Sequence, residues 1–224
     1  MLNERSFSSV PAPGPEAPIE TVTDAPAAKE KEGRILAAAV RVFARHGYHG
    51  SSMAAVAREA GIATGTTYLY FDRKQDLLVA LFARHLTDYV SRCAPALAAE
   101  APGVPRLRRL AEQHLAFFAG DRELATVFQI HIREPDPILA DGIRPIVSTY
   151  FDLIGEVIQA GVDAGAFDPE LDVRLARQVF FGALDEIVTG WLRAKRPFPL
   201  MSALEPVATI LARGLGAIQP GDPS

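Results

Sequence analysis

The sequence predicts an all-α protein with a small N-terminal domain and a larger C-terminal one. From Gly33 onward, apolar residues recur at the spacing of one helix face, as Ile35, Ala39 and Phe43 do. Beyond residue 75 the chain continues in helical segments, separated by "APGVP", "AGD", "EPDP", "AGAFDPE" and "KRPFPL". With 224 residues, of which 49% are hydrophobic, the chain can bury a sizeable core.

The first 29 residues have a different composition. They contain five prolines, at positions 11, 13, 15, 18 and 26, among serine, alanine and glutamate. Little apolar area is available there to offset the entropy lost on ordering. We therefore expect residues 1–29 to form a disordered leader.

Cysteine content and charge restrict the compartment and the partners. The single cysteine, Cys93, cannot form an intramolecular disulfide and argues against a cysteine-built metal site, which fits a reducing compartment. No signal peptide is evident, and no apolar stretch reaches the roughly 18 residues of a membrane span, so we expect a cytoplasmic protein with no membrane partner. The formal charge is −4, yet residues 34–74 hold six basic and two acidic side chains, so positive charge is concentrated near the N-terminus.

Two short helical segments follow the first helix. Ser51 or Ser52 can cap the segment "MAAVAREA", and Gly61 stops it. A third helix can begin at Thr64 and run through Tyr70. Two short helices joined by a tight glycine turn have the spacing of a helix-turn-helix, whose second member enters a DNA major groove with its N-terminus first.

The third helix carries side chains that suit DNA. Its threonines and Gly65 offer hydroxyls, methyl groups and close backbone approach to base edges. On a helix Tyr68 and Tyr70 stand about 200° apart, so they cannot both lie on one buried face. We expect them to flank the groove, with Lys74 on a phosphate; the alternative is that both tyrosines are half-buried core residues, as we expect Phe71 to be. The expected DNA contacts are Ser51, Ser52, Thr64, Gly65, Thr66, Thr67, Tyr68, Tyr70 and Lys74.

A stretch of about fifty residues, from "GRILAAAVRVFARHG" to "TTYLYFDRKQDLLVALF", resembles the DNA-binding domain of the TetR family of bacterial transcriptional repressors. The family's glycine after the first helix falls on Gly47, its turn glycine on Gly61, and its Tyr-x-x-Phe-x-x-Lys pattern on Tyr68, Phe71 and Lys74. The resemblance implies an all-helical homodimer that binds double-stranded operator DNA. Residues 30–75 would form the helix-turn-helix domain, and residues 76–219 a domain for ligand binding and dimerisation.

Six helical segments follow the third helix. The first, from residue 73 or 74 to about 94, joins the two domains and is the expected lever between ligand and DNA. Pro145 should kink or restart the segment 141–164. The last two, about 170–194 and 200–217, would form a four-helix dimer interface according to the resemblance. Small residues at contact spacing in these two helices are Ala176, Gly182, Ala183, Gly190, Ala208 and Ala212.

Two later stretches, "AGDRELATVFQIHIRE" and "LDVRLARQVFFGALDEIVTGWL", resemble the repressors of fatty-acid degradation within this family. These bind long-chain acyl-coenzyme A and then release their operators. Pro135, Pro137 and Pro145 depart from the continuous helix expected there. The residues allow such a ligand, since phenylalanines can line an apolar pocket and arginines can meet phosphates. The candidates are Arg106, Arg109, Phe117, Phe118, Phe128, Arg133, Arg177, Phe180 and Phe181.

Catalytic and metal chemistry find little support. The five histidines form no pair at i, i+4, and no serine, cysteine or carboxylate constellation marks a nucleophile, so we expect no enzyme activity, cofactor or metal. Asp185 and Glu186, inside an apolar helix, are expected to form a buried hydrogen bond across the dimer. Two alternatives remain: a repressor of the same family that controls an efflux or other operon and senses a different hydrophobic ligand, and an all-helical lipid-binding enzyme.

Overall fold

A computed structural model describes residues 25–131, 136–196 and 198–217, and the regular structure of these residues is entirely helical. The predicted all-α fold is therefore confirmed for this part of the chain. None of these helices has an apolar stretch that could span a bilayer. The helices are α1 (Ala25–His46), α2 (Met53–Ala60), α3 (Thr64–Tyr68), α4 (Lys74–Ala98), α5 (Val104–Gly120), α6 (Arg122–His131), α7 (Pro137–Asp163), α8 (Val173–Arg193) and α9 (Leu204–Gly214), with the 3-10 helix η1 (Leu200–Ala203) before α9.

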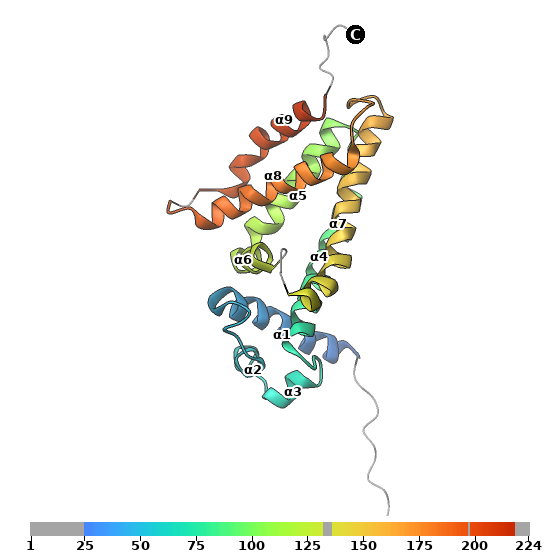
Figure 1. Ribbon diagram of the computed structural model, residues 1–224. Helices are drawn as coiled ribbons and strands as arrows, with labels where there is room; N and C mark the ends of the chain where they lie inside the picture. The colour runs from blue at the N-terminus through green and yellow to red at the C-terminus, as the bar shows by residue number, and fades with distance from the viewer. Residues whose placement is uncertain (1–24, 132–135, 197, 218–224) are drawn as a thin grey trace, which may run out of the picture.

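Helices α1, α2 and α3 form a small domain at one end of the molecule, in the lower half of Figure 1. Helix α4 starts in this small domain and runs up into the larger one, where it packs against α5 and α7. Helix α6 lies above α1 and packs on it. Two helices, α4 and α6, therefore connect the large domain to the small one.

Local capping fixes the small domain. The hydroxyl of Ser52 accepts a hydrogen bond from the N–H of Ala55 and so caps α2. Gly61 ends α2 with a φ of 67°, in the left-handed region that favours glycine, and Gly47 ends α1 with a φ of 69°. These two turns bring α2 against α1 and α3 against α2.

The first helix begins earlier than we expected. Residues 1–24 lie outside the described part of the chain, but residues 25–29, which we assigned to a disordered leader, form the start of α1. Pro26 lies in the first helical turn, where its missing N–H has no helical partner. The run from Ala27 to Glu32 consists of alanine, lysine and glutamate, which favour helix without apolar periodicity.

Proline interrupts the helices less than we expected. Helix α7 is continuous from Pro137 to Asp163, so Pro145 does not restart it, and α4 extends past Pro95 to Ala98. Pro145 and Asp141 are both exposed, so water can reach the carbonyl group that proline leaves without an N–H partner. Pro137 takes the first position of α7, and Pro135 lies outside the described residues.

One hydrophobic core extends through both domains. Helix α4 contributes buried side chains along its length, from Leu77 near the small domain to Phe82, Tyr89 and Leu97 in the large one. Phe71 is buried, as expected. Because packed interiors transmit displacement rather than absorb it, a shift of α4 at Phe82 must also be felt at its first turn.

Candidate nucleic-acid interface and ligand-binding core

Helix α3 presents a small exposed surface. Thr64 and Gly65 are exposed, Thr66 is half-buried, and Tyr68 is 49% exposed. A Cβ atom added at Gly65 would meet no atom within 4 Å, so the backbone there is open to close approach. Leu69, directly after α3, is 83% exposed, and sequence reasoning missed it. Its position between two tyrosines was the only signal in the sequence. The methyl groups of an exposed leucine suit contact with thymine.

Two expected DNA contacts face inward instead. Thr67 is fully buried, because it lies one helical turn before the buried Phe71 and shares its face. Ser51 is also buried, and its hydroxyl donates to the carbonyl of Gly47 at 2.6 Å, so it holds the turn between α1 and α2. Tyr70 is half-buried against the core, whereas Ser52 is exposed at the start of α2.

Lys74 has an internal role that we did not expect. Its Nζ donates to the carbonyls of Tyr48 at 2.6 Å and Ser51 at 2.9 Å, and lies 4.3 Å from the centre of the Tyr48 ring. Partial burial lowers the pKa of this ammonium group. The first residue of α4 is thus fastened to the turn between α1 and α2, and a phosphate would have to compete with these bonds.

Polar and aromatic contacts also join the small domain to α6. Arg45 lies between Glu59 of α2, at 3.4 Å, and Glu123 of α6, at 3.5 Å. The ring of Tyr48 meets the ring of His131, the last residue of α6, at 5.6 Å between centroids. The same Tyr48 therefore contacts the first residue of α4 and the last residue of α6.

The small residues expected at the dimer interface fall into two groups. Ala176, Ala208 and Ala212 are buried within the protomer, so they offer little surface to a partner. Gly182 and Gly190 lie on the open side of α8, where an added Cβ atom would meet nothing within 4 Å.

Large apolar side chains lie exposed on the same two helices, which the sequence pattern did not reveal. Leu175 and Val179 are exposed one turn apart on α8, half-buried Ala183 follows Val179 by a turn, and Ile210 is 69% exposed on α9. An exposed apolar face of this kind is typical of a protein–protein interface.

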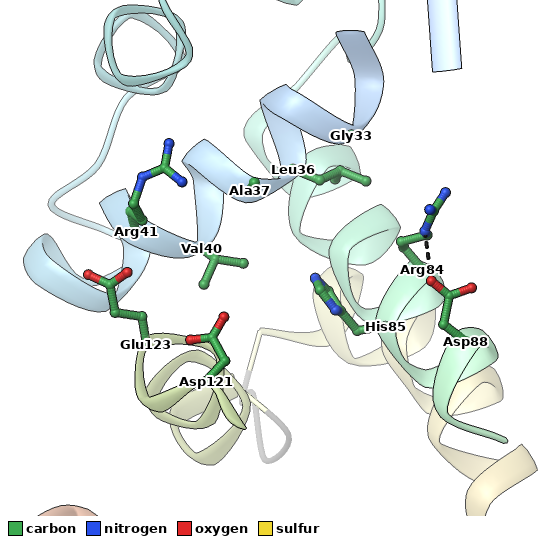
Figure 2. A pocket seen from close by; sticks show the side chains of 10 residues that line it. All are labelled: Gly33, Leu36, Ala37, Val40, Arg41, Arg84, His85, Asp88, Asp121 and Glu123. Carbon is green, nitrogen blue, oxygen red and sulfur yellow. Dashed lines mark hydrogen bonds and ion pairs between the residues drawn. The ribbon is translucent and has the colours of Figure 1, made fainter. Parts of the chain in front are cut away.

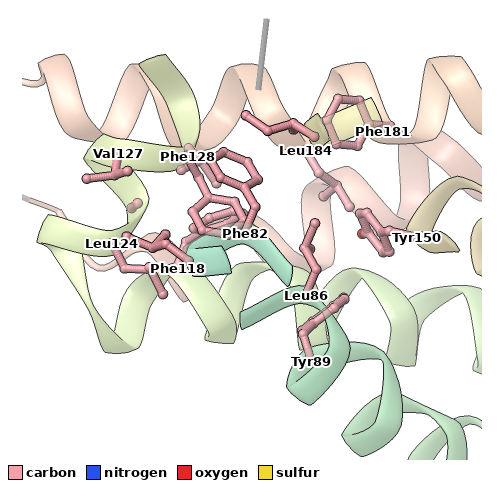
Figure 3. Close-up of a cluster of buried hydrophobic side chains, with 14 of the residues drawn as sticks. Phe82, Leu86, Tyr89, Phe118, Leu124, Val127, Phe128, Tyr150, Phe181 and Leu184 are labelled. Carbon is pink, nitrogen blue, oxygen red and sulfur yellow. The ribbon is translucent and has the colours of Figure 1, made fainter. Parts of the chain in front are cut away.

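Aromatic side chains from five helices form the centre of the large domain (Figure 3). Phe82 of α4 stacks on Phe128 of α6 with 4.2 Å between ring centroids. The ring contacts continue from Phe128 to Phe117 and Phe118 of α5, and to Tyr150 and Phe181 through further rings. Phe117, Phe118, Phe128 and Phe181 therefore come together as expected, and Phe180 is buried one position away from them.

Polar groups are also buried in this region. Asp185 accepts a hydrogen bond from Gln129 of α6 at 2.8 Å, and Thr189 donates to the same amide at 2.6 Å. Asp185 thus has a hydrogen-bond partner inside its own protomer, and the expected bond across a dimer stays a prediction. His114 of α5 lies 2.7 Å from the hydroxyl of Tyr150, and both side chains are buried.

The arginines proposed for phosphate binding that the structure describes already pair with other groups of the protein. Arg106 donates to the carbonyl of Glu100, and Arg109 pairs with the carboxylates of Glu100 and Glu112, each at 2.7 Å. The bonds to Glu100 fasten α5 to the segment directly after α4, whereas Glu112 lies on α5 itself. Arg133 lies outside the described residues.

Arg177 lies in acidic surroundings. Its guanidinium pairs with Asp152 at 3.0 Å and lines a cavity of about 490 Å³ that also includes Glu156 and Asp163. Three carboxylates around one arginine disfavour a phosphate group. The structure therefore argues against Arg177 as a phosphate contact.

A second cavity, of about 310 Å³, lies at the junction of the two domains (Figure 2). It is lined by Leu36 and Val40 of α1, by His85 and Asp88 of α4, and by Asp121 before α6. Burial lowers the pKa of His85, and the nearby carboxylates of Asp121 and Asp88 oppose this shift.

Comparison with known proteins accounts for both domains. Residues 35–81 match the bacterial regulatory proteins of the tetR family, and residues 82–214 match the C-terminal region of YsiA-like proteins. A fatty acid metabolism regulator protein of Bacillus subtilis (strain 168) is 34% identical over 187 residues, which cover 84% of this chain and 96% of that protein.

Two solved structures are similar over the same range. The fatty acid degradation regulator FadR from Bacillus halodurans superposes with a TM-score of 0.78 and 37% identity, covering 82% of this chain and 98% of that one. The transcriptional regulator FadR from Bacillus subtilis, in complex with stearoyl-CoA, has a TM-score of 0.78 and 34% identity, covering 81% and 98%.

Proposed function

Because the chain belongs to the TetR family of bacterial regulatory proteins, we propose that it represses fatty-acid degradation genes and that long-chain acyl-coenzyme A releases it from operator DNA. One observation carries this proposal: the similarity to FadR from Bacillus subtilis, which was solved with stearoyl-CoA, extends over both domains. The aromatic interior, which can surround an acyl chain, supports the same ligand.

DNA binding belongs to the small domain. Thr64, Gly65 and Thr66 would reach base edges, while Tyr68 and Leu69 would contact the sugar–phosphate backbone or thymine methyl groups. Ser52 at the start of α2 and the half-buried Tyr70 remain candidates for phosphate contacts. A homodimer formed through α8 and α9 would place two such surfaces on half-sites about 34–36 Å apart or a near multiple.

Coupling between ligand and DNA would run through α4 and α6. Phe82 and Phe128 stack in the aromatic cluster, and the ends of the same two helices meet at Tyr48 through Lys74 and His131. A chain inserted beside Phe82 and Phe128 must displace these rings, and the displacement reaches the turn before α2. The spacing of the two recognition helices would then change.

The proposal places the protein in the cytoplasm, where operator DNA lies, and assigns it no catalytic activity and no cofactor. The relatives described above are named as regulators, which supports this assignment. A lipid-binding enzyme with this fold would show no sequence-specific gel shift. A repressor that senses another hydrophobic ligand would bind DNA but would not respond to acyl-coenzyme A.

The proposal predicts a steep dependence on acyl chain length. Shifting a repressor from 1:99 to 99:1 requires about 5.5 kcal/mol of differential affinity, and each buried methylene contributes about 0.8 kcal/mol. About seven differentially buried methylenes would therefore suffice. Acyl-coenzyme A series from two to eighteen carbons should be titrated against a duplex that the protein selects from random sequence, with release followed by fluorescence anisotropy.

The two-carbon acyl-coenzyme A should release no DNA. Longer chains should release it at progressively lower concentration, and the concentration needed should fall about tenfold for each two added methylenes. Coenzyme A alone and free stearate are the matched controls. If coenzyme A released DNA as well as stearoyl-coenzyme A did, or if no chain length released it, the acyl response would be refuted. A gel shift would still support the assignment as a DNA-binding regulator.

A further inference from the structure

The aromatic cluster contains a buried polar atom without a partner. His114 is 3% exposed, and its Nδ1 forms the hydrogen bond with Tyr150 described above. Its Nε2 is buried as well, but no described residue hydrogen-bonds to it. Such a group costs free energy comparable to a lost hydrogen bond, so a ligand atom that pairs with it would be favoured.

The protonation of the pair determines what that atom can bind. Burial lowers the pKa of His114 to about 3, so the imidazole is neutral at pH 7 and carries one N–H. Burial raises the pKa of Tyr150, so its hydroxyl stays protonated and can donate to Nδ1. Of the two tautomers that this contact allows, the one in which Tyr150 donates to Nδ1 has its hydrogen on Nε2. The atom without a partner is then a donor, and it requires an acceptor oxygen.

The surroundings favour a neutral acceptor. The ring centroids of Phe118, Tyr150 and Phe181 lie 5.1, 5.7 and 6.3 Å from that of His114. An ionised carboxylate would lose its hydration among these rings without a countercharge, whereas the carbonyl oxygen of an ester would not carry that penalty.

A cavity lies beside Tyr89, whose ring contacts Tyr150 of this pair. It measures about 200 Å³, lies between α4 and α5, and is lined by Tyr89 and Phe117 together with the polar side chains of Arg92 and Gln113. The Tyr89 ring contacts the Tyr150 ring at 5.2 Å, and Figure 3 shows Tyr150 between Tyr89 and Phe181. A chain that enters through this cavity would meet the His114–Tyr150 pair at the edge of the aromatic cluster.

We propose that Nε2 of His114 donates a hydrogen bond to the carbonyl oxygen of the ligand's thioester, and so selects acyl thioesters over other apolar chains. This rests on the proposed acyl-coenzyme A response and adds the residue that recognises the thioester. The methylenes beyond the carbonyl would lie among Phe118 and Phe128.

The test compares stearoyl-coenzyme A with S-octadecyl-coenzyme A, a thioether of the same chain length that lacks only the carbonyl oxygen. By isothermal titration calorimetry, the wild-type protein should bind the thioester about tenfold more tightly, the effect of one buried hydrogen bond. In His114→Phe the ratio should fall to about one. Phe118→Leu is the matched control, because it alters the same cluster and should weaken both ligands while keeping their ratio.

A second variant, His114→Gln, retains a neutral N–H donor and should retain part of the preference for the thioester. Equal affinities of the wild-type protein for the two compounds, or a ratio unchanged in His114→Phe, would overturn the role of His114 while leaving the acyl response intact. Failure of both compounds to bind the wild-type protein would instead refute the proposed function.

Discussion

Replacing Lys74 by Met should lower the free energy of unfolding by about 1.5–3 kcal/mol, because a charged donor to the carbonyls of Tyr48 and Ser51 is lost. The methionine keeps an apolar stem over the Tyr48 ring. Since α4 is no longer fastened to the turn before α2, operator affinity should fall at every salt concentration. The slope of log affinity against log salt should stay unchanged, because no phosphate contact is removed. Urea unfolding and gel shifts across a salt series measure both quantities.

The neighbouring exposed Arg73 supplies the control. It pairs with Asp76 at 2.8 Å at the surface, so Arg73→Met should change the free energy of unfolding by less than about 0.5 kcal/mol. If Lys74→Met left stability unaltered and reduced the salt slope by about 0.9, Lys74 would be a phosphate contact, as the sequence pattern alone predicted.

Gly182→Leu should convert the dimer to monomers and weaken operator binding by about 100-fold or more, because one protein can no longer engage two half-sites together. The added side chain meets no atom within 4 Å in the protomer, so the protomer should still fold. In a dimer built on α8 and α9 the same side chain would press against the partner. Sedimentation velocity at micromolar concentration and gel shifts test the two effects.

Gly120→Leu is the matched control, since an added Cβ atom there also meets nothing within 4 Å, but the residue ends α5 rather than lying on α8. It should leave both the dimer and operator affinity unchanged. An intact Gly182→Leu dimer would mean that the subunits associate through another surface.

Local chemistry made much of the fold predictable. Gly47 and Gly61 take the left-handed conformation that their positions after a helix predicted, and Ser52 caps α2. Six helices follow α3 in the described residues, as the breaks in the sequence indicated. Each of these features depends on residues close together in the chain, so one sequence suffices to recognise them.

Long-range contacts were not predictable in this way. Lys74 and Ser51 look like phosphate ligands by residue type, but carbonyl groups 23 and 26 positions away in the chain bind Lys74, and the Ser51 hydroxyl donates back to its own turn. The prediction that these arginines bind phosphate failed for a similar reason, because helix packing brings carboxylates near Arg109 and Arg177. Which face of α3 is buried depends on how α3 packs against α2, so Thr67 was misplaced and Leu69 was missed.

The ligand site was predictable in composition but not in arrangement. Four of the proposed phenylalanines meet in one cluster, yet His114, which carries the unpaired nitrogen, gave no signal in the sequence beyond its helical position. A buried histidine is usually a satisfied core residue, and only the geometry distinguishes this one.

The central claim is that acyl-coenzyme A and operator DNA compete through the conformation of one dimer. Linkage requires the two effects to be equal, since a ligand that weakens DNA binding by some factor must itself be weakened by DNA by the same factor. The most direct measurement is therefore the affinity of stearoyl-coenzyme A for the free dimer and for the dimer saturated with its selected duplex, alongside operator affinity with and without stearoyl-coenzyme A. We predict that both affinities fall by the same factor, at least about tenfold. Unchanged affinities, or affinities that both rise, would contradict release by the ligand.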